Sequence, residues 1–148
     1  MEEEVVIIVA EDDDGHFSLI KKNLKRAGIS NEIIRFIDGQ AVVNFLFMEG
    51  EGAKRDHNKG YLLLLDINMP KLDGVEVLRQ VKGDPELKKI PVIMLTTSDD
   101  QQRTDMCRNL GCTAYIVKPV EYGDFVTTIG SIGLFLSVVV MPEIEEIV

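Results

Sequence analysis

Residues 61–66 read YLLLLD, an unbroken apolar run that ends in an acidic residue. A strand with one face in water alternates apolar and polar residues, whereas an unbroken run is typical of a parallel strand covered on both faces. Similar runs, weaker in the last two, occur at residues 5–10, 91–95, 114–117 and 32–36. We therefore predict one buried parallel sheet of five strands.

Segments with helical spacing lie between these runs. Apolar residues recur three or four positions apart before Gly28 and Gly111, and again within residues 41–46 and 75–81. Glycine is common just past a helix because it adopts the left-handed conformation without steric cost. A further helix is expected to begin near Glu121. This alternation predicts an α/β fold, a doubly wound sheet with helices on both faces in a three-layer sandwich, forming one domain over residues 1–148.

The composition disfavours several classes of function. No apolar run reaches the roughly 20 residues that span a bilayer, and the acidic N-terminus differs from an export signal. We therefore expect a cytoplasmic protein that does not bind membranes. With 25 acidic and 16 basic residues and a net charge of −9, the chain is a poor match for nucleic acid. Cys107 and Cys112 have no nearby histidine, which disfavours a zinc site or a disulfide scaffold.

Polar residues follow four of the predicted strands. They are Glu11, Asp12 and Asp13 after the first strand, Asp66 after the third, Thr96 at the end of the fourth and Lys118 after the fifth. Ligands of open α/β sheets bind at this carboxyl edge, so we expect these side chains to lie close together. Carboxylates held together need a proton or a cation, and oxygen ligands alone suit Mg²⁺ or Mn²⁺. Each acid taken singly could instead be a solvated loop residue.

An aspartate, a cation and a lysine at one edge favour phosphoryl transfer. The carboxylate of Asp66 would attack phosphorus, while the metal and Lys118 neutralise charge on the moving group and Thr96 donates a hydrogen bond. The Lys118–Pro119 bond, if cis, would aim the lysine sharply, with an ordinary turn as the alternative.

Four motifs, taken in order, resemble those of the receiver domains of two-component response regulators. They are VAEDD (9–13), LLDINMPKLDG (64–74), IPVIMLT (90–96) and AYIVKP (114–119). The resemblance covers nearly the whole chain and implies a flavodoxin-like fold with strand order 2-1-3-4-5 and five helices. It also implies phosphorylation by a sensor histidine kinase rather than turnover of a separate substrate.

The resemblance implies a metal site and a phosphoacceptor. Glu11 and Asp12 match the acidic pair, and Asp66 matches the phosphoacceptor, which also binds the metal. The backbone carbonyl of Asn68 completes the protein ligands. Counting from the acidic pair to Gly28 favours Glu11 with Asp12 and leaves Asp13 as an outer acid or a stand-in.

The resemblance implies switch residues as well. Thr96 and Lys118 match the hydroxyl and the ammonium that contact the phosphoryl group. Tyr115 matches an aromatic residue whose inward or outward rotamer reports activation, with simple packing as the alternative. Ser98 lies where the family tunes hydrolysis.

A narrower resemblance is to single-domain regulators of bacterial phytochrome kinases. It rests on the extended loop 49–60, which could contact a partner, and on the stretches LTTS (95–98) and SIGLFLSVVVMP (131–142). It implies a bacteriophytochrome as the kinase, output by protein contact, and a homodimer through the fifth helix and the C-terminal extension 134–148. The expected interface residues are Phe135, Leu136 and Val139, with a fold-back of the tail as the alternative. Gly130 and Gly133 weaken the expected helix.

Two other classes of function stay open at this point. An aspartate-nucleophile phosphohydrolase also combines aspartate, Mg²⁺ and lysine, but it normally has a second aspartate where this chain has Asn68. A receiver-like binding module that is never phosphorylated would normally lack the acceptor, the metal ligands or the lysine. Turnover of phosphate esters and labelling by acetyl phosphate separate these classes.

Overall fold

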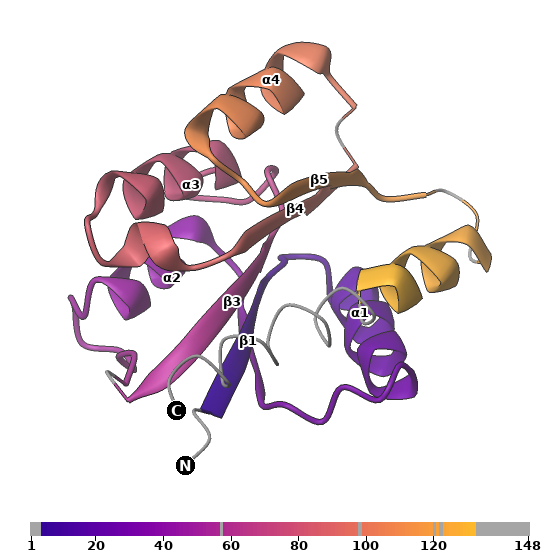
Figure 1. Cartoon of the computed structure of the whole chain (residues 1–148), viewed down its shortest axis with the longest axis horizontal. Helices are drawn as coiled ribbons and strands as arrows, with labels where there is room; N and C mark the ends of the chain where they lie inside the picture. The colour runs from indigo at the N-terminus through magenta and orange to yellow at the C-terminus, as the bar shows by residue number, and fades with distance from the viewer. Residues whose placement is uncertain (1–3, 57, 98, 120, 122, 133–148) are drawn as a thin grey trace.

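Strands and helices alternate along the chain (Figure 1). The computed structural model describes residues 4–56, 58–97, 99–119, 121 and 123–132. The elements are β1 (Glu4–Ala10), α1 (Asp14–Arg26), β2 (Ile33–Phe36), α2 (Gly39–Leu46), β3 (Lys59–Leu65), α3 (Gly74–Gly83), the 3₁₀-helix η1 (Leu87–Lys89), β4 (Val92–Thr96), α4 (Gln101–Leu110) and β5 (Ala114–Val117). One more helix covers residues 123–132 and is called helix 123–132 below. The predicted alternation of strands and helices is confirmed.

The strands form one parallel sheet in the order β2-β1-β3-β4-β5. This confirms the predicted flavodoxin-like fold. The winding direction reverses at β1, whose last residue Ala10 is paired with Leu65, the last residue of β3. The residues that follow these two strands, Glu11 and Asp66, are therefore neighbours at the carboxyl edge of the sheet, where open α/β sheets bind ligands.

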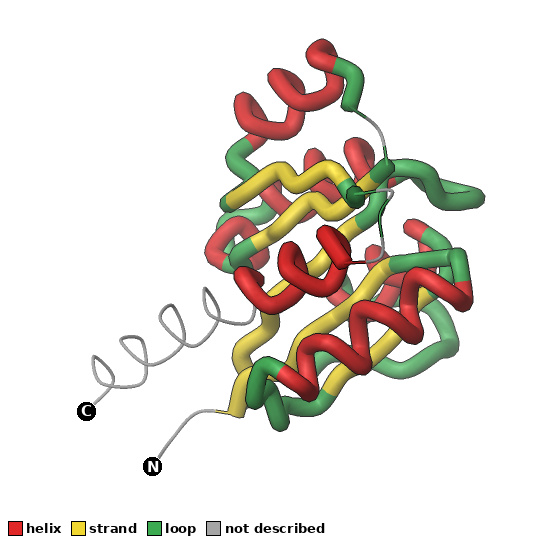
Figure 2. Tube along the Cα trace, turned by 90° about the vertical axis from the view of Figure 1, so that its right-hand side faces the viewer, coloured by secondary structure: helices red, strands yellow, loops and turns green. Residues whose placement is uncertain are grey.

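Each face of the sheet is covered by its own group of helices. Along β1, Ile8 and Ala10 belong to a core under α2, α3 and α4. Ile7 and Val9 belong to a second core under α1 and helix 123–132. Figure 1 shows the two groups on opposite sides of the sheet, and Figure 2 shows α1 and helix 123–132 next to each other on their face. Burial on both faces explains why the sequence of these strands is apolar throughout.

An aspartate begins each of the helices α1 to α4. Its side-chain oxygen accepts a hydrogen bond from a backbone N–H of the first turn, which satisfies a donor that the helix leaves unpaired. Asp13 accepts from the N–H of His16, Asp38 from that of Ala41, Asp73 from that of Glu76, and Asp100 from that of Gln102. Gly28 and Gly111 have φ of +90° and +100° just past α1 and α4, as their predicted place at helix ends requires.

The structure corrects two details of the sequence prediction and decides a third that was left open. The fifth strand is only half-buried, since β5 lies at the sheet edge and Val117 is 42% exposed. The loop before β3 ends at residue 58, because β3 begins at Lys59. The Lys118–Pro119 bond is trans, as are all peptide bonds in the described part of the chain. Ser98 and the expected interface residues Phe135, Leu136 and Val139 lie outside the described residues.

Among the residues that the structure describes, no helix has the length and apolar character needed to cross a membrane.

The two cysteines lie in and beside the core under α4. Cys107 is fully buried, and Cys112 is half-buried against the same core. Burial raises the pKa of Cys107 to about 11, so about one thiol in a thousand is ionised at pH 8. We expect iodoacetamide to leave Cys107 unmodified in the native protein for a time that alkylates it fully in urea, as mass spectrometry can measure. Equal rates in the two conditions would contradict this burial.

Candidate functional site

Three carboxylates meet at the carboxyl edge of the sheet. One oxygen from each of Glu11, Asp12 and Asp66 lies within 4.8 Å of the others. Glu11 and Asp66 are buried, whereas Asp12 is exposed to solvent. The order of the strands brings them together, because the loops that follow β1 and β3 are neighbours.

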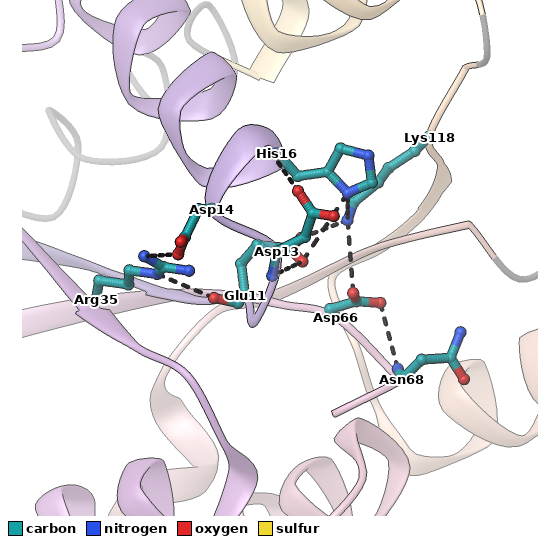
Figure 3. A network of polar contacts seen from close by, with 8 residues as sticks. All are labelled: Glu11, Asp13, Asp14, His16, Arg35, Asp66, Asn68 and Lys118. Atoms are coloured by element: carbon teal, nitrogen blue, oxygen red, sulfur yellow. Dashed lines mark hydrogen bonds and ion pairs between the residues drawn. The ribbon is translucent and has the colours of Figure 1, made fainter. Parts of the chain in front are cut away.

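The Lys118 ammonium faces two of these carboxylates, those of Glu11 and Asp66 (Figure 3). It forms an ion pair with Oε1 of Glu11, and its Nζ lies 3.5 Å from Oδ2 of Asp66. The backbone N–H of Lys118 donates to the carbonyl of Thr96 at 2.7 Å, which joins the ends of β4 and β5. Thr96 is itself fully buried. The structure thus brings together the side chains that follow β1, β3 and β5, and it joins Thr96 to Lys118 through the backbone.

Burial and the Lys118 ammonium act on the pKa of Glu11 in opposite directions. Burial raises its pKa above the usual value, and the charge of Asp66 adds to this, while the hydrogen bond and the charge of Lys118 pull the pKa down. The backbone N–H of Asp13 also donates to Glu11 Oε2 at 3.1 Å. The cluster thus sets three carboxylates against the one ammonium of Lys118, which contacts two of them. Its donors are all hard oxygens, which fits a divalent cation such as Mg²⁺ or Mn²⁺.

Asp13 lies next to this cluster but caps α1. Its Oδ1 accepts from the backbone N–H of His16 at 2.9 Å, and this hydrogen bond lowers the pKa of Asp13. The grouped ligand oxygens come from Glu11, Asp12 and Asp66. The geometry therefore supports Asp12, and not Asp13, as the second acid of the pair.

Asn68 lies in the loop after β3, and Tyr115 lies on β5. The backbone N–H of Asn68 donates to Asp66 Oδ1 at 3.3 Å, and its side-chain oxygen accepts from Arg103 of α4 at 3.2 Å. Tyr115 is half-buried and packs against the core under α2, α3 and α4. Its role as a rotamer switch stays a prediction.

Two basic side chains of the site were missed by sequence reasoning. Arg35 of β2 donates from Nε to the carbonyl of Glu11 at 3.0 Å, pairs with Asp14 at 2.8 Å, and lies over the Phe17 ring. It therefore holds the loop between β1 and α1 from the neighbouring strand. His16 of α1 contacts Lys118, with 3.1 Å between Nδ1 and Nζ. The only sequence signal for Arg35 was its place on the strand next to β1. The only signal for His16 was its place about one helical turn beyond the acids.

Gly74 allows α3 to begin directly against the loop that carries Asp66. A Cβ at this position would lie 2.1 Å from the Asp66 carbonyl oxygen, far inside contact distance. We expect Gly74→Ala to lower the free energy of unfolding by about 1–3 kcal/mol, because backbone has to shift. Gly83→Ala, at the other end of α3 with open space around it, is the control and is expected to be neutral or slightly stabilising. Urea titration of both variants measures this, and equal midpoints would contradict it.

The comparisons with known proteins bear on what this site does. A family model described as response regulator receiver domain matches residues 7–130. The chain belongs to the response regulator receiver family. Receiver domains are the part of a response regulator that is phosphorylated in two-component signalling. This receiver is 36% identical to the response regulator Rcp1 of Synechocystis sp. over 138 residues, which are 93% of this chain and 92% of Rcp1.

Solved receiver structures have the same fold. A receiver domain from Rhodospirillum rubrum matches with a TM-score of 0.83 and 44% identity, over 90% of this receiver and 94% of that chain. The Mn²⁺-bound form of response regulator Rcp1 matches with a TM-score of 0.80 and 35% identity, over 88% and 93% of the two chains. The phosphorylated cyanobacterial phytochrome response regulator RcpA matches with a TM-score of 0.79 and 32% identity, over 89% and 93%.

Proposed function

We propose that this chain is a single-domain response regulator, spanning residues 1–148, that accepts a phosphoryl group on Asp66 from a sensor histidine kinase. The observation that carries the proposal is the grouping of the buried Asp66 with two further carboxylates and with Lys118, whose Nζ is 3.5 Å from Asp66 Oδ2. The chain assists its own phosphorylation and dephosphorylation and turns over no separate substrate.

In the proposed transfer, an oxygen of Asp66 attacks the phosphorus of a phosphohistidine on the kinase. The P–N bond breaks as the O–P bond forms, and the leaving imidazole nitrogen keeps the bonding electron pair. Glu11, Asp12, Asp66 and the backbone carbonyl of Asn68 would hold Mg²⁺, with Mn²⁺ able to replace it. The bound cation would neutralise charge on the phosphoryl oxygens. The Mn²⁺-bound form of Rcp1 supports this choice of metal.

Lys118 and Thr96 would contact the remaining phosphoryl oxygens. A phosphoryl group adds a charge of about −1.5 to −2, which draws the ammonium and the hydroxyl toward Asp66. The backbone N–H of Lys118 is bonded to the Thr96 carbonyl, so movement of either residue involves the ends of both β4 and β5. Tyr115 of β5 would then change rotamer and pass the signal to a partner protein bound near α4.

Labelling by a small phosphodonor tests the function. The wild-type protein with radiolabelled acetyl phosphate and Mg²⁺ is expected to incorporate label that hydroxylamine releases, as an acyl phosphate requires. EDTA is expected to lower the rate about ten-fold or more. Absence of label with Mg²⁺ would indicate a module that is not phosphorylated. Steady release of phosphate from p-nitrophenyl phosphate would indicate a phosphohydrolase.

We propose a phytochrome-type kinase as the donor. The support is the likeness to RcpA, which is named as a phytochrome response regulator. A bacteriophytochrome kinase is expected to label Asp66 faster than sensor kinases of other classes mixed with the same protein. Equal rates across the classes would remove the phytochrome link and leave the receiver function intact.

We also propose a homodimer built from helix 123–132 and the C-terminal extension 134–148, with Phe135, Leu136 and Val139 in the interface. The support is the apolar sequence of this segment, which needs cover from water. Light scattering at micromolar concentration is expected to give twice the mass of the 16.6 kDa chain, and Phe135→Glu is expected to give the monomer. A monomeric wild-type protein would contradict the proposal.

A further inference from the structure

The imidazole of His16 touches the ammonium group at the centre of the site. Nδ1 of His16 lies 3.1 Å from Lys118 Nζ, and His16 belongs to the first turn of α1. Figure 3 shows the ring beside the lysine, on the far side of the ammonium from Asn68. The ring also stacks on Phe125 of helix 123–132, with centroids 6.1 Å apart and planes 26° apart.

The chemistry of the two groups decides the direction of this contact. A lysine ammonium has three donors and no acceptor, so a nitrogen at hydrogen-bond distance must offer a lone pair. Nδ1 of His16 is therefore the acceptor, and the ring proton lies on Nε2. An imidazolium could not accept this hydrogen bond. The carboxylate with which a charged ring could pair, Oε2 of Glu11, lies 4.0 Å from Nδ1, farther than Lys118 Nζ at 3.1 Å.

His16 completes the set of acceptors around Lys118. The three N–H groups have three acceptors, Glu11 Oε1, Asp66 Oδ2 and His16 Nδ1. The Lys118 side chain is only 2% exposed, so water is a poor substitute for a missing partner. Because the three acceptors come from the loops after β1 and β3 and from α1, they fix where the ammonium points. The stack on Phe125 fixes the plane of the imidazole in turn.

We propose that His16 is a positioning residue for phosphoryl transfer. By accepting a hydrogen bond at Nδ1, it holds the Lys118 ammonium toward Asp66, where the charge on the incoming phosphoryl group has to be neutralised. This inference rests on the proposed function of Asp66 as the acceptor. His16 itself contacts neither the phosphoryl group nor the cation in this role and acts through Lys118.

A pair of variants with equal shape separates the hydrogen bond from packing. In His16→Asn, the amide Oδ1 takes about the place of Nδ1 and can accept from Lys118. His16→Leu has the same branching without an acceptor. We expect the maximal rate of labelling by acetyl phosphate with Mg²⁺ to fall about ten-fold or more in the leucine variant. We expect the asparagine variant to stay within about three-fold of the wild type.

The outcomes of this experiment separate failure of the proposed role of His16 from failure of the proposed function. Equal labelling rates in the asparagine and leucine variants, whether fast or slow, would overturn the role of His16 as an acceptor. Failure of the wild type to label would instead overturn the proposed function. If the leucine variant does not fold, ¹⁵N NMR of the wild-type protein still tests the inference. It is expected to show the Nε2–H tautomer of His16, and an Nδ1–H tautomer or an imidazolium would refute it.

Discussion

Asp66→Asn is expected to abolish labelling of the protein by acetyl phosphate or by a kinase. An amide oxygen is a far weaker nucleophile than a carboxylate, so no O–P bond forms at this position. The substitution also removes one of the three carboxylates grouped within 4.8 Å and so weakens the hold on a cation. The measurement is the amount of hydroxylamine-sensitive label per chain after a time that saturates the wild type.

Asp13→Asn is the matched control for this experiment. It makes the same chemical change one residue beyond the acidic pair, and asparagine caps a helix about as well as aspartate does. Because Asp13 is occupied as the cap of α1, this variant is expected to label like the wild type. Retained label in Asp66→Asn, or its loss in Asp13→Asn, would show that the acceptor or the acidic pair has been assigned to the wrong carboxylate.

The sheet and the acids at its edge are predictable because burial leaves a trace in the sequence. Leu62 to Leu65 are buried on both faces of β3, which explains a run without polar residues. The residue after such a run necessarily lies at the carboxyl edge, and this is where Asp66 is found. Parallel pairing then brings the end of β1 to the end of β3. Burial therefore places Glu11 and Asp66 at the same edge of the sheet, and the strand order that the resemblance implies makes them neighbours.

The remainder of the site is not predictable in this way, because it depends on side-chain direction and on which groups already have partners. Asp12 and Asp13 are alike in sequence, yet Asp13 is committed to the N–H of His16 and Asp12 is not. Arg35 reaches Glu11 only through the register of β2 on β1, where it is paired with Val9. His16 acquires its contact with Lys118 from the direction in which α1 leaves the sheet.

Lys118→Met is expected to lower the free energy of unfolding by about 3–5 kcal/mol at neutral pH in the presence of EDTA. The side chains of Lys118 and Glu11 are each only 2% exposed. Without the Lys118 ammonium, the carboxylates of Glu11 and Asp66 repel each other in a buried place where water screens them poorly. Urea unfolding gives the free energy. Lys71→Met is the control, since Lys71 pairs with Asp38 at 3.7 Å but is 70% exposed, and its loss is expected to cost at most about 1 kcal/mol.

Adding Glu11→Gln to Lys118→Met is expected to restore most of the lost stability. The double variant removes both charges while keeping similar shapes, and a buried ion pair replaced as a unit is often close to neutral. The two changes should therefore be strongly non-additive, as expected for groups in contact. If Lys118→Met costs no more than Lys71→Met, or if the two site substitutions simply add, Glu11 does not depend on the ammonium. In that case the carboxylates must obtain their compensation from bound protons, and the site would not be poised to hold a divalent cation.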